Sequence, residues 1–256
     1  MQNNIFSGLF VGQNLIKLKE VASTNTFLKD ALSKSTPLMD GTVIMAENQF
    51  AGRGQTNNKW LSEPGQNLTF SVLLNPSFLQ IDKQFDLNKA ISLALNDVLR
   101  NYAGNQALIK WPNDCYIGNN KTGGMLIENM VSGNSIRHAI IGIGLNVNQT
   151  DFPAPFRNVT SLKQVLHKNY DLNILLGEIC SSVEARYLQL KAGLFKKLTA
   201  EYTERLYLLN QWSVFNVNQG FLRGKITGVS PSGQLELMTA DGIRLFNSQE
   251  IEFINN

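Results

Sequence analysis

The feature that most constrains the fold lies between residues 86 and 147, where one long helix signal precedes a series of strand signals. Apolar residues recur at helical spacing along residues 86–102, which predicts an amphipathic helix with one buried face. The strand candidates that follow are residues 107–111, 114–118, 123–131 and 136–147. We expect a hairpin turn at Asn119-Asn120, because asparagine tolerates positive φ. Together these signals predict an α/β-type body.

Further elements surround this block. Ser23 or Thr24 is expected to cap a helix running to about Ser35, since either hydroxyl can accept from the free N–H groups of the first turn. Residues 48–59 are predicted to be a loop by composition. The remaining strands and helices are expected over residues 41–47, 67–74, 172–190 and about 195–208.

After Trp212 the sequence changes character. Short alternating segments are separated by turn sequences at residues 217–220, 230–233 and 240–242. Such a series predicts a small C-terminal β-barrel. We place the boundary near residue 209, which gives domains 1–208 and 209–256.

Composition excludes several classes of protein. The net charge of +3 suits an anionic substrate such as a nucleotide, but no run of five or six basic residues indicates nucleic acid. The apolar runs are too short for a membrane span, so we expect a soluble, cytoplasmic protein. Cys115, Cys180, His138 and His167 are isolated, which argues against a disulfide framework, a zinc site or a Ser–His relay.

The first of three unusual segments covers residues 47–60. Gly52 and Gly54 flank Arg53, so backbone N–H groups can converge on an anion beside the guanidinium. An ordinary mobile surface loop remains the alternative. A dinucleotide-binding fingerprint is disfavoured because Asn57 stands where the third glycine belongs.

The second segment is Lys110-Trp111-Pro112-Asn113-Asp114, followed by Lys121 and Gly123-Gly124. Adjacent glycines weaken a strand and usually mark close approach by a ligand or another backbone. A lysine beside them can neutralise a carboxylate and a phosphate together. A hairpin with solvated lysines is the alternative.

The third segment, residues 142–148, alternates glycine with apolar residues. Gly142 and Gly144 leave one face of a strand bare, and a flat ring can lie against it. Asn146 can offer its amide to an adenine edge. Packing against a helix would also explain the glycines.

Together the segments resemble the biotin–protein ligase family. They occur in the family's order, namely Ser23-Thr24-Asn25, Gly52-Arg53-Gly54 with Trp60, Lys110-Trp111-Pro112-Asn113-Asp114, Lys121 with Gly124, and Gly142-Ile143-Gly144-Leu145-Asn146-Val147-Asn148. The resemblance covers nearly the whole chain. It implies an α/β (α+β) fold, a mixed central sheet flanked by helices as in class II aminoacyl-tRNA synthetases, with residues 1–208 as the catalytic biotin- and ATP-binding domain.

The resemblance also implies two half-reactions. Biotin and MgATP give biotinyl-5′-adenylate, and a lysine of a biotin carboxyl carrier protein then takes the biotin. The implied biotin-binding residues are Ser23, Thr24, Asn25, Gln49, Gly52, Arg53, Gly54, Lys121, Gly124 and Gly144. The implied nucleotide-binding residues are Arg53, Gly54, Gln55, Trp60, Lys121 and Asn146. Lys121, Arg53 and Lys110 would be catalytic, and Asp114 is a candidate magnesium ligand.

The chemistry itself favours this set of residues. Attack of one anion on another needs charge neutralisation and alignment more than a general base. Arg53, Lys110, Lys121 and Mg²⁺ would supply the positive charge, and the nucleophilic lysine would come from the carrier. No tightly bound cofactor is expected, and a homodimer remains open.

The sequence departs from the family pattern in two places. Gln55, Thr56, Asn57 and Asn58 replace the pattern's Arg, Arg, Gly and Arg, which predicts a weaker grip on the adenylate. Ser23 lies too close to Met1 for the N-terminal helix-turn-helix domain of many bacterial relatives, so we expect no DNA partner.

Two rival functions remain. A lipoate or octanoate ligase or transferase would share the fold, but its Arg-Arg-x-Ser-Gly-Gly-Gly stretch is missing, and binding of biotin or of lipoate separates the two. A non-catalytic nucleic-acid-binding module would leave Lys121 and Arg53 without a role, and a salt-dependent shift with nucleic acid would favour it.

Overall fold

The computed structural model describes residues 8–34, 38–55, 58–153, 158–217 and 220–254. Its centre is a seven-stranded mixed sheet in the order β1-β2-β5-β9-β8-β7-β6. The strands are β1 (Leu15–Val21), β2 (Val43–Gln49), β5 (Leu68–Leu74), β6 (Ala107–Lys110), β7 (Asp114–Ile117), β8 (Asn120–Ser132) and β9 (Ser135–Leu145). β1 and β2 are parallel, and the other neighbours are antiparallel.

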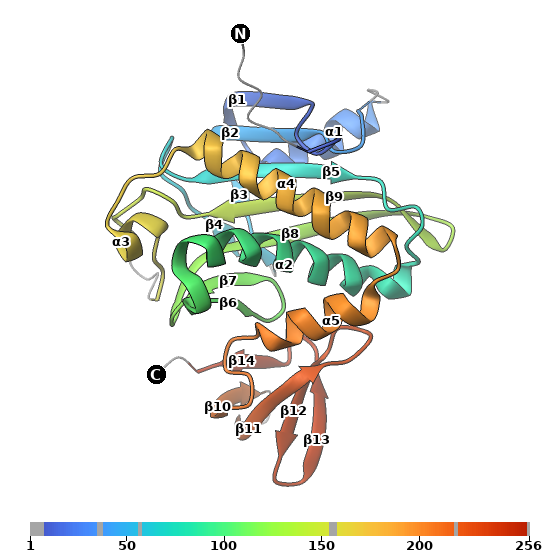
Figure 1. Cartoon of the computed structure of the whole chain (residues 1–256), viewed down its shortest axis with the longest axis vertical. Helices are drawn as coiled ribbons and strands as arrows, with labels where there is room; N and C mark the ends of the chain where they lie inside the picture. Colours follow the sequence, from blue (N-terminus) through green and yellow to red (C-terminus); the bar gives the residue numbers. More distant parts are fainter. Residues whose placement is uncertain (1–7, 35–37, 56–57, 154–157, 218–219, 255–256) are drawn as a thin grey trace.

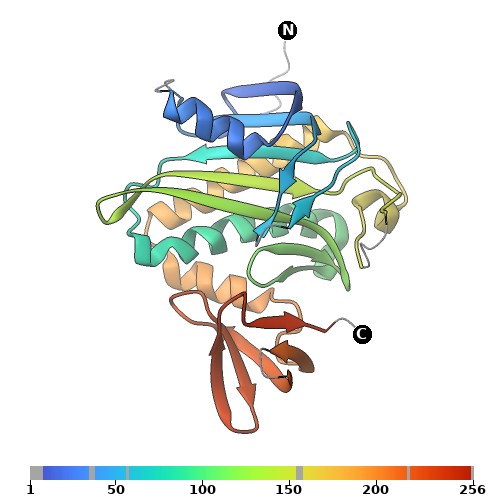
Figure 2. The same cartoon turned by 180° about the vertical axis from the view of Figure 1, so that it is seen from behind.

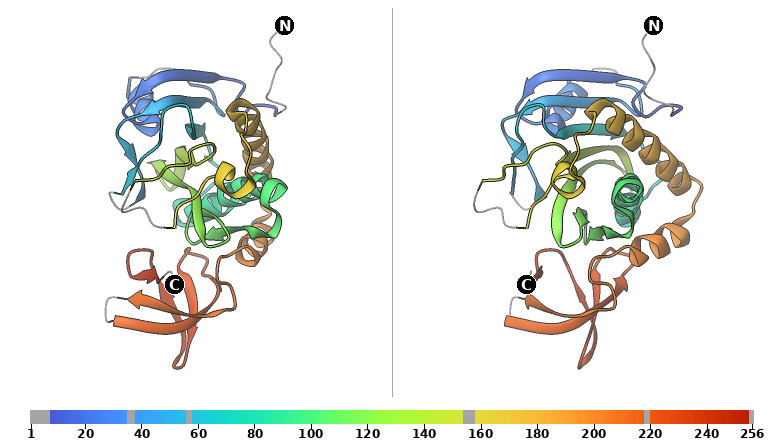
Figure 3. Two further views of the ribbon diagram at one scale, coloured as in Figure 1. Left: turned by 90° about the vertical axis from the view of Figure 1, so that its left-hand side faces the viewer. Right: turned by 60° about the vertical axis from the view of Figure 1, so that its left-hand side comes forward.

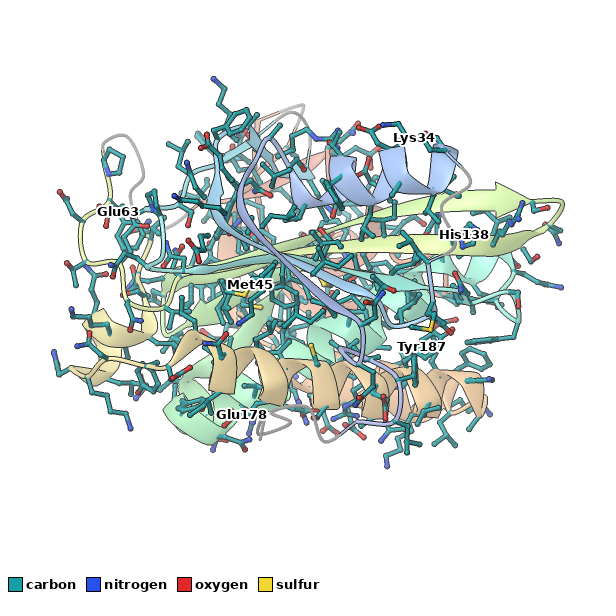
Figure 4. All side chains as sticks on the ribbon, turned by 90° about the horizontal axis from the view of Figure 1, so that it is seen from above. Lys34, Met45, Glu63, His138, Glu178 and Tyr187 are labelled. Carbon is teal, nitrogen blue, oxygen red and sulfur yellow. The ribbon has the colours of Figure 1, made fainter. Side chains whose placement is uncertain are left out.

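Helices cover both faces of this sheet, as expected for a mixed sheet flanked by helices. α2 (Gln84–Ala103) and α4 (Leu172–Lys191) lie on one face (Figure 1), and α1 (Thr24–Ser33) lies on the other (Figure 2). Figure 4 shows both sides at once, with Met45 of β2 between α1 and the labelled Glu178 and Tyr187 of α4. The remaining helices are η2 (Ile81–Lys83), η3 (Gly104–Gln106), α3 (Leu162–Leu166) and α5 (Phe195–Glu204).

Two buried cores follow from the alternation of side chains along the strands. Val43 and Met45 of β2 face the large core under α2 and α4. Ile44, between them, faces a smaller core under α1 with Leu28 and Leu73. The site described below lies on the α1 face, where polar side chains and glycines interrupt the apolar packing.

The C-terminal segment forms an open antiparallel sheet, and the predicted closed barrel is wrong. Its strands are β10 (Trp212–Val217), β11 (Gly220–Val229), β12 (Leu235–Thr239), β13 (Gly242–Phe246) and β14 (Ile251–Phe253), in the order β13-β12-β11-β10-β14. β13 pairs with β12 and β14 with β10, so both remain edge strands. No described residue of β13 pairs with β14, so the sheet stays open.

This sheet packs below the body, beside β6, β7 and α5 (Figure 3). Trp111 Nε1 donates to the Gly233 carbonyl at 2.9 Å, and a Cβ at Gly233 would lie 2.4 Å from the Phe85 ring. The large core includes Phe215 and Ile226 of the C-terminal sheet. The domain boundary near residue 209 stays a prediction.

Most predicted elements occur where expected, with local corrections. The turn between β7 and β8 falls at Gly118-Asn119, and Gly118 has the positive φ, +58°, that we assigned to asparagine. The predicted loop 48–59 contains a small ribbon of β3 (Gly52–Arg53) and β4 (Lys59–Trp60). α5 ends at Glu204 rather than near residue 208. β1 and α3 were not predicted.

Other expectations fall where the structure gives no description. The predicted end of α1 at Ser35 and the turn residues Asn218 and Gln219 lie outside the described residues. In the part of the chain that is described, no helix combines the length and the apolarity needed to cross a membrane.

Candidate active site

A cavity of about 260 Å³ lies on the α1 face of the sheet, between the start of α1, the β3–β4 ribbon and strands β8 and β9. Figure 2 shows the ribbon and α1 on this face. The predicted residues that line it are Ser23, Thr24, Asn25, Gln49, Arg53, Gly54, Gln55, Trp60, Asp114, Lys121, Gly124 and Gly144. The structure therefore brings together segments that are far apart in the sequence.

One end of the cavity is a buried polar cluster at the start of α1. Ser23 caps the helix by accepting from the Thr26 N–H, as predicted. Thr24 donates to Gln49 Oε1 through its N–H at 3.0 Å and its hydroxyl at 3.3 Å. Ser71 Oγ donates to Asn25 Oδ1 at 2.6 Å and lies 2.7 Å from Thr24 Oγ1. These contacts fix the directions of the donors and acceptors before any ligand arrives.

The glycines of β9 make room for two side chains of the protein itself. A Cβ at Gly142 would lie 2.5 Å from Asn25 Oδ1, and a Cβ at Gly144 would lie 2.4 Å from Trp60 Cε2. The bare face predicted from the sequence exists, but Asn25 and the Trp60 indole lie on it. Gly142 and Gly144 therefore shape the cavity by leaving space for the Asn25 and Trp60 side chains that form its walls.

Two cations at the cavity are held by carboxylates. Arg53 Nη2 lies 3.3 Å from Glu128 Oε2 and donates to Thr26 Oγ1 at 3.2 Å. Lys121 Nζ lies 2.7 Å from Asp114 Oδ1, and both side chains are partly exposed. A Cβ at Gly124 would lie 2.8 Å from the same Asp114 oxygen, so this glycine makes room for the ion pair. Partly exposed pairs of this kind are weak enough to open for an incoming anion.

A second cavity of about 410 Å³ shares Trp60 and Lys121 with the first and is lined also by Asn146 and Phe152. Asn146 Nδ2 donates to the Thr160 carbonyl at 3.1 Å. Its Oδ1 is buried and has no hydrogen-bond partner within the described ranges. A buried acceptor left open is costly, so a donor on a bound molecule, such as an exocyclic amino group, would satisfy it.

Lys110 and Gly52 do not line the first cavity. Lys110 Nζ donates to Tyr116 Oη at 3.0 Å and lies over the Tyr116 and Phe253 rings. Burial lowers the pKa of Lys110, although nearby Asp114 opposes the shift. Gly52 lies beside an adjoining cavity, where a Cβ would meet the Trp60 carbonyl oxygen at 2.5 Å. Thr56 and Asn57 lie outside the described residues.

Several residues at the site were not singled out from the sequence. Ser71 is a fully buried hydroxyl inside an apolar strand, a signal that could have been noticed. Lys59 lies opposite Arg53 on the ribbon and lines all three adjoining cavities. Glu128 and Ser248 reach the site only through the fold, from β8 and from the C-terminal sheet.

Among the described residues, no cysteine lines the cavity and no cluster of metal ligands is found. Cys115 and Cys180 are buried, and burial raises the pKa of each thiol to about 12, so both are protonated at neutral pH. Over the described ranges, no three His, Cys, Asp or Glu side chains come together as a metal site. Arg53 and Lys121 place two positive charges beside the cavity, where they can neutralise a bound anion.

Comparison with known proteins places this chain among relatives of known type. The family model described as the biotin/lipoate A/B protein ligase family matches residues 18–146. The bifunctional ligase/repressor BirA of Bacillus subtilis is 31% identical over 245 residues, covering 94% of this chain and 74% of that protein. A biotin–[acetyl-CoA-carboxylase] ligase of Paracoccus denitrificans is 32% identical over 129 residues, covering 50% of this chain and 53% of its own length.

Solved structures extend the match to the whole fold. The biotin protein ligase of Aquifex aeolicus in complex with biotin and ATP superposes with a TM-score of 0.80 at 29% identity, covering 95% of this chain and 100% of that chain. Sequence and fold thus agree over both the body and the C-terminal sheet. The chain belongs to the biotin/lipoate A/B protein ligase family.

Proposed function

We propose that this chain is an ATP-dependent biotin–protein ligase, which forms biotinyl-5′-adenylate and transfers biotin to a lysine of a carrier protein. The Paracoccus and Aquifex relatives are biotin ligases, and the Aquifex protein was solved with biotin and ATP. The observation that carries the proposal is the single cavity that places a buried polar cluster beside Arg53 and Lys121.

The polar cluster suits the ureido ring of biotin, which has two N–H donors and one carbonyl acceptor. Gln49 and Thr24 hold fixed positions at this end, and Ser23 and Asn25 line it beside them. Leu126, which pairs with Gly142 on the α1 face, and the Trp60 indole beside Gly144 give the neighbouring wall an apolar character that fits the thioether ring and the hydrocarbon chain. Biotin would thus enter ring first, with its carboxylate towards Arg53 and Lys121.

In the first half-reaction a biotin carboxylate oxygen attacks the α-phosphorus of ATP, and pyrophosphate leaves. Both reactants are anions, so the barrier falls when Arg53 and Lys121 neutralise the charge that gathers between them. Asp114 holds Lys121 at the cavity until the phosphate competes for the ammonium group. No general base is required, because a carboxylate is already deprotonated at neutral pH.

Magnesium would accompany ATP in this reaction. Asp114 is a single carboxylate at the cavity, which fits a Mg²⁺ ion held mainly by substrate phosphates and by one or two carboxylates. When bound, the ion would neutralise phosphate charge. Asp114 remains a candidate ligand.

The second half-reaction needs an amine from outside. The carrier lysine attacks the carbonyl carbon of the mixed anhydride, an amide bond forms and AMP leaves. Gln55 and Trp60 line the cavity near Lys121, and Asn146 lines the adjoining one, so we place the nucleotide across their boundary. Lys110 does not line either cavity, and its catalytic role stays a prediction.

Biotin-dependent exchange of labelled pyrophosphate into ATP tests the proposed reaction, with lipoate and octanoate as competing acids. Exchange that requires biotin supports the proposal, and exchange supported by lipoate alone would replace it with the lipoate-ligase alternative. Two finer predictions stay with the proposal. We expect that the protein does not bind operator DNA, which a footprint at physiological salt tests. A homodimer is left open by the sequence, and sedimentation tests for it.

A further inference from the structure

Glu128 of β8 lies where the start of α1, the β3–β4 ribbon and the central sheet meet. Its Oε2 accepts from Asn25 Nδ2 at 2.8 Å and lies 3.3 Å from Arg53 Nη2. Its Oε1 lies 3.5 Å from Lys29 Nζ. The Glu128 side chain is 22% exposed, so the surroundings limit its movement. One carboxylate oxygen therefore fixes a side chain of the polar cluster and the cation of the ribbon together.

Arg53 depends on this contact for its direction. It belongs to a two-residue strand, and its side chain is 48% exposed, so little packing restrains the guanidinium. Nη2 donates to Glu128 and to Thr26, while no hydrogen bond from the other guanidinium N–H groups to a described residue is seen. Arg53 lines the cavity in this position. A guanidinium can hold one carboxylate and still donate to a second anion, because its five donors point in different directions.

We propose that Glu128 is a positioning residue, which orients Arg53 towards the reacting anions and couples that orientation to Asn25 in the biotin end of the cavity. The proposal rests on the proposed function and adds a residue to it. Glu128 itself touches neither substrate. Its effect on adenylation passes through Arg53, and its effect on biotin binding passes through Asn25.

The two effects can be separated by the choice of substitution. Glu128→Gln keeps an oxygen that can accept from Asn25 but removes the charge that holds Arg53. We expect kcat for adenylation to fall on the order of 10-fold. Loss of a half-exposed ion pair alone would change the rate a few-fold. Misplacing a reacting group by about 1 Å would lower the rate ~100-fold, and the expected effect lies between the two. The KM for biotin should stay near that of the wild type. Glu128→Ala removes both contacts and should raise the KM for biotin as well.

The decisive measurement is a double-mutant cycle of Glu128→Gln and Arg53→Ala, read by biotin-dependent pyrophosphate exchange. If Glu128 acts through Arg53, Glu128→Gln should change the rate by less than about twofold when Arg53 is already alanine. Lys29→Ala is the matched control, because it removes the other ion pair of Glu128 without touching Arg53 or Asn25. It should leave both kinetic constants unchanged.

Thermal melts of each variant show whether a loss of activity comes from loss of the fold or from a displaced Arg53 side chain in a folded protein. If Glu128→Gln does not fold, Glu128→Asp replaces it, since the shorter side chain keeps the charge but draws the carboxylate away from Arg53, and it should show the same dependence on Arg53. Additive effects in the cycle would overturn the proposal, and so would faster adenylation in Glu128→Gln, which would mean that Glu128 competes with the substrate for Arg53. A wild type without exchange would instead refute the proposed function.

Discussion

Gly142 and Gly144, two residues apart on one face of β9, should map the two ends of the active site. A Cβ at Gly144 would lie 2.4 Å from Trp60 Cε2, whereas non-bonded carbon atoms settle at about 3.5 Å or more. Gly144→Ala must therefore displace the indole by about 1 Å. Trp60 lines the first cavity and the one beside Asn146, so the displacement reaches the proposed nucleotide end.

Gly142→Ala acts at the other end. Its Cβ would lie 2.5 Å from Asn25 Oδ1, which accepts from Ser71, so the amide and its contact with Glu128 must shift. A displacement of about 1 Å at a reacting site can cost on the order of 100-fold in rate. We expect Gly144→Ala to lower kcat/KM for ATP by about 10- to 100-fold, and Gly142→Ala to lower kcat/KM for biotin by a similar factor.

The assay is pyrophosphate exchange with each substrate varied in turn, alongside thermal melts. Overpacking typically costs 1–3 kcal/mol of stability, so both variants should remain folded near room temperature. Gly228→Ala in the C-terminal sheet is the control, since its Cβ would meet the flexible end of Glu236 at 3.2 Å and Thr203 Cγ2 at an ordinary contact distance of 3.9 Å. Equal losses for ATP and biotin in both variants would refute the division of the cavity into two ends.

Three further predictions test single residues. Lys121→Ala should slow adenylation by roughly 100- to 1,000-fold, as loss of a preorganised donor does, in pyrophosphate exchange at saturating biotin. Gln55→Arg should retain preformed adenylate about 10- to 150-fold longer in an off-rate measurement without carrier, because it adds a charge-assisted contact. Burial raises the pKa of Glu184, but N–H groups of residues 9–11 outweigh it and hold the pKa below its usual range. The ionised Glu184 therefore adds to stability fully above the unfolded pKa of about 4.3, and this contribution is lost as pH falls through the lower folded pKa. Glu184→Gln should lower the free energy of unfolding by about 1.5–3 kcal/mol at pH 7. The free energy of unfolding of the variant should also depend less on pH in the acid range, which unfolding curves at several pH values measure.

The sequence predicts those helices and strands whose apolar residues recur at a regular spacing. It does not predict the role of a residue whose contacts depend on how distant strands and helices pair in the fold. Residues 86–102 and the strands around Gly118 show regular spacing, so α2 and β6 to β9 could be predicted. Glu128 and Ser71 could not be assigned, because their contacts with Asn25 join strands and a helix far apart in the chain. The glycines at 142 and 144 indicate a bare face, but only the fold shows which side chains lie on it.

One prediction was wrong for a physical reason, and another stays untested. Short alternating strands are equally typical of a closed barrel and of an open sheet, so closure could not be inferred from residues 212–253 alone. The catalytic role expected for Lys110 stays a prediction, which rested on its standing in the same motif as Asp114. A side chain in a strand points to one of two faces, and Lys110 points to the Tyr116 and Phe253 rings.

The most direct test of the account is mass spectrometry of a biotin carboxyl carrier domain after incubation with this protein, biotin, ATP and Mg²⁺. We predict that one lysine of the carrier gains a single biotinyl group, that the gain requires ATP, and that replacing this lysine by arginine abolishes it. A carrier that stays unmodified while the same preparation binds biotin, or one that gains a lipoyl group instead when both acids are offered, would contradict the assignment.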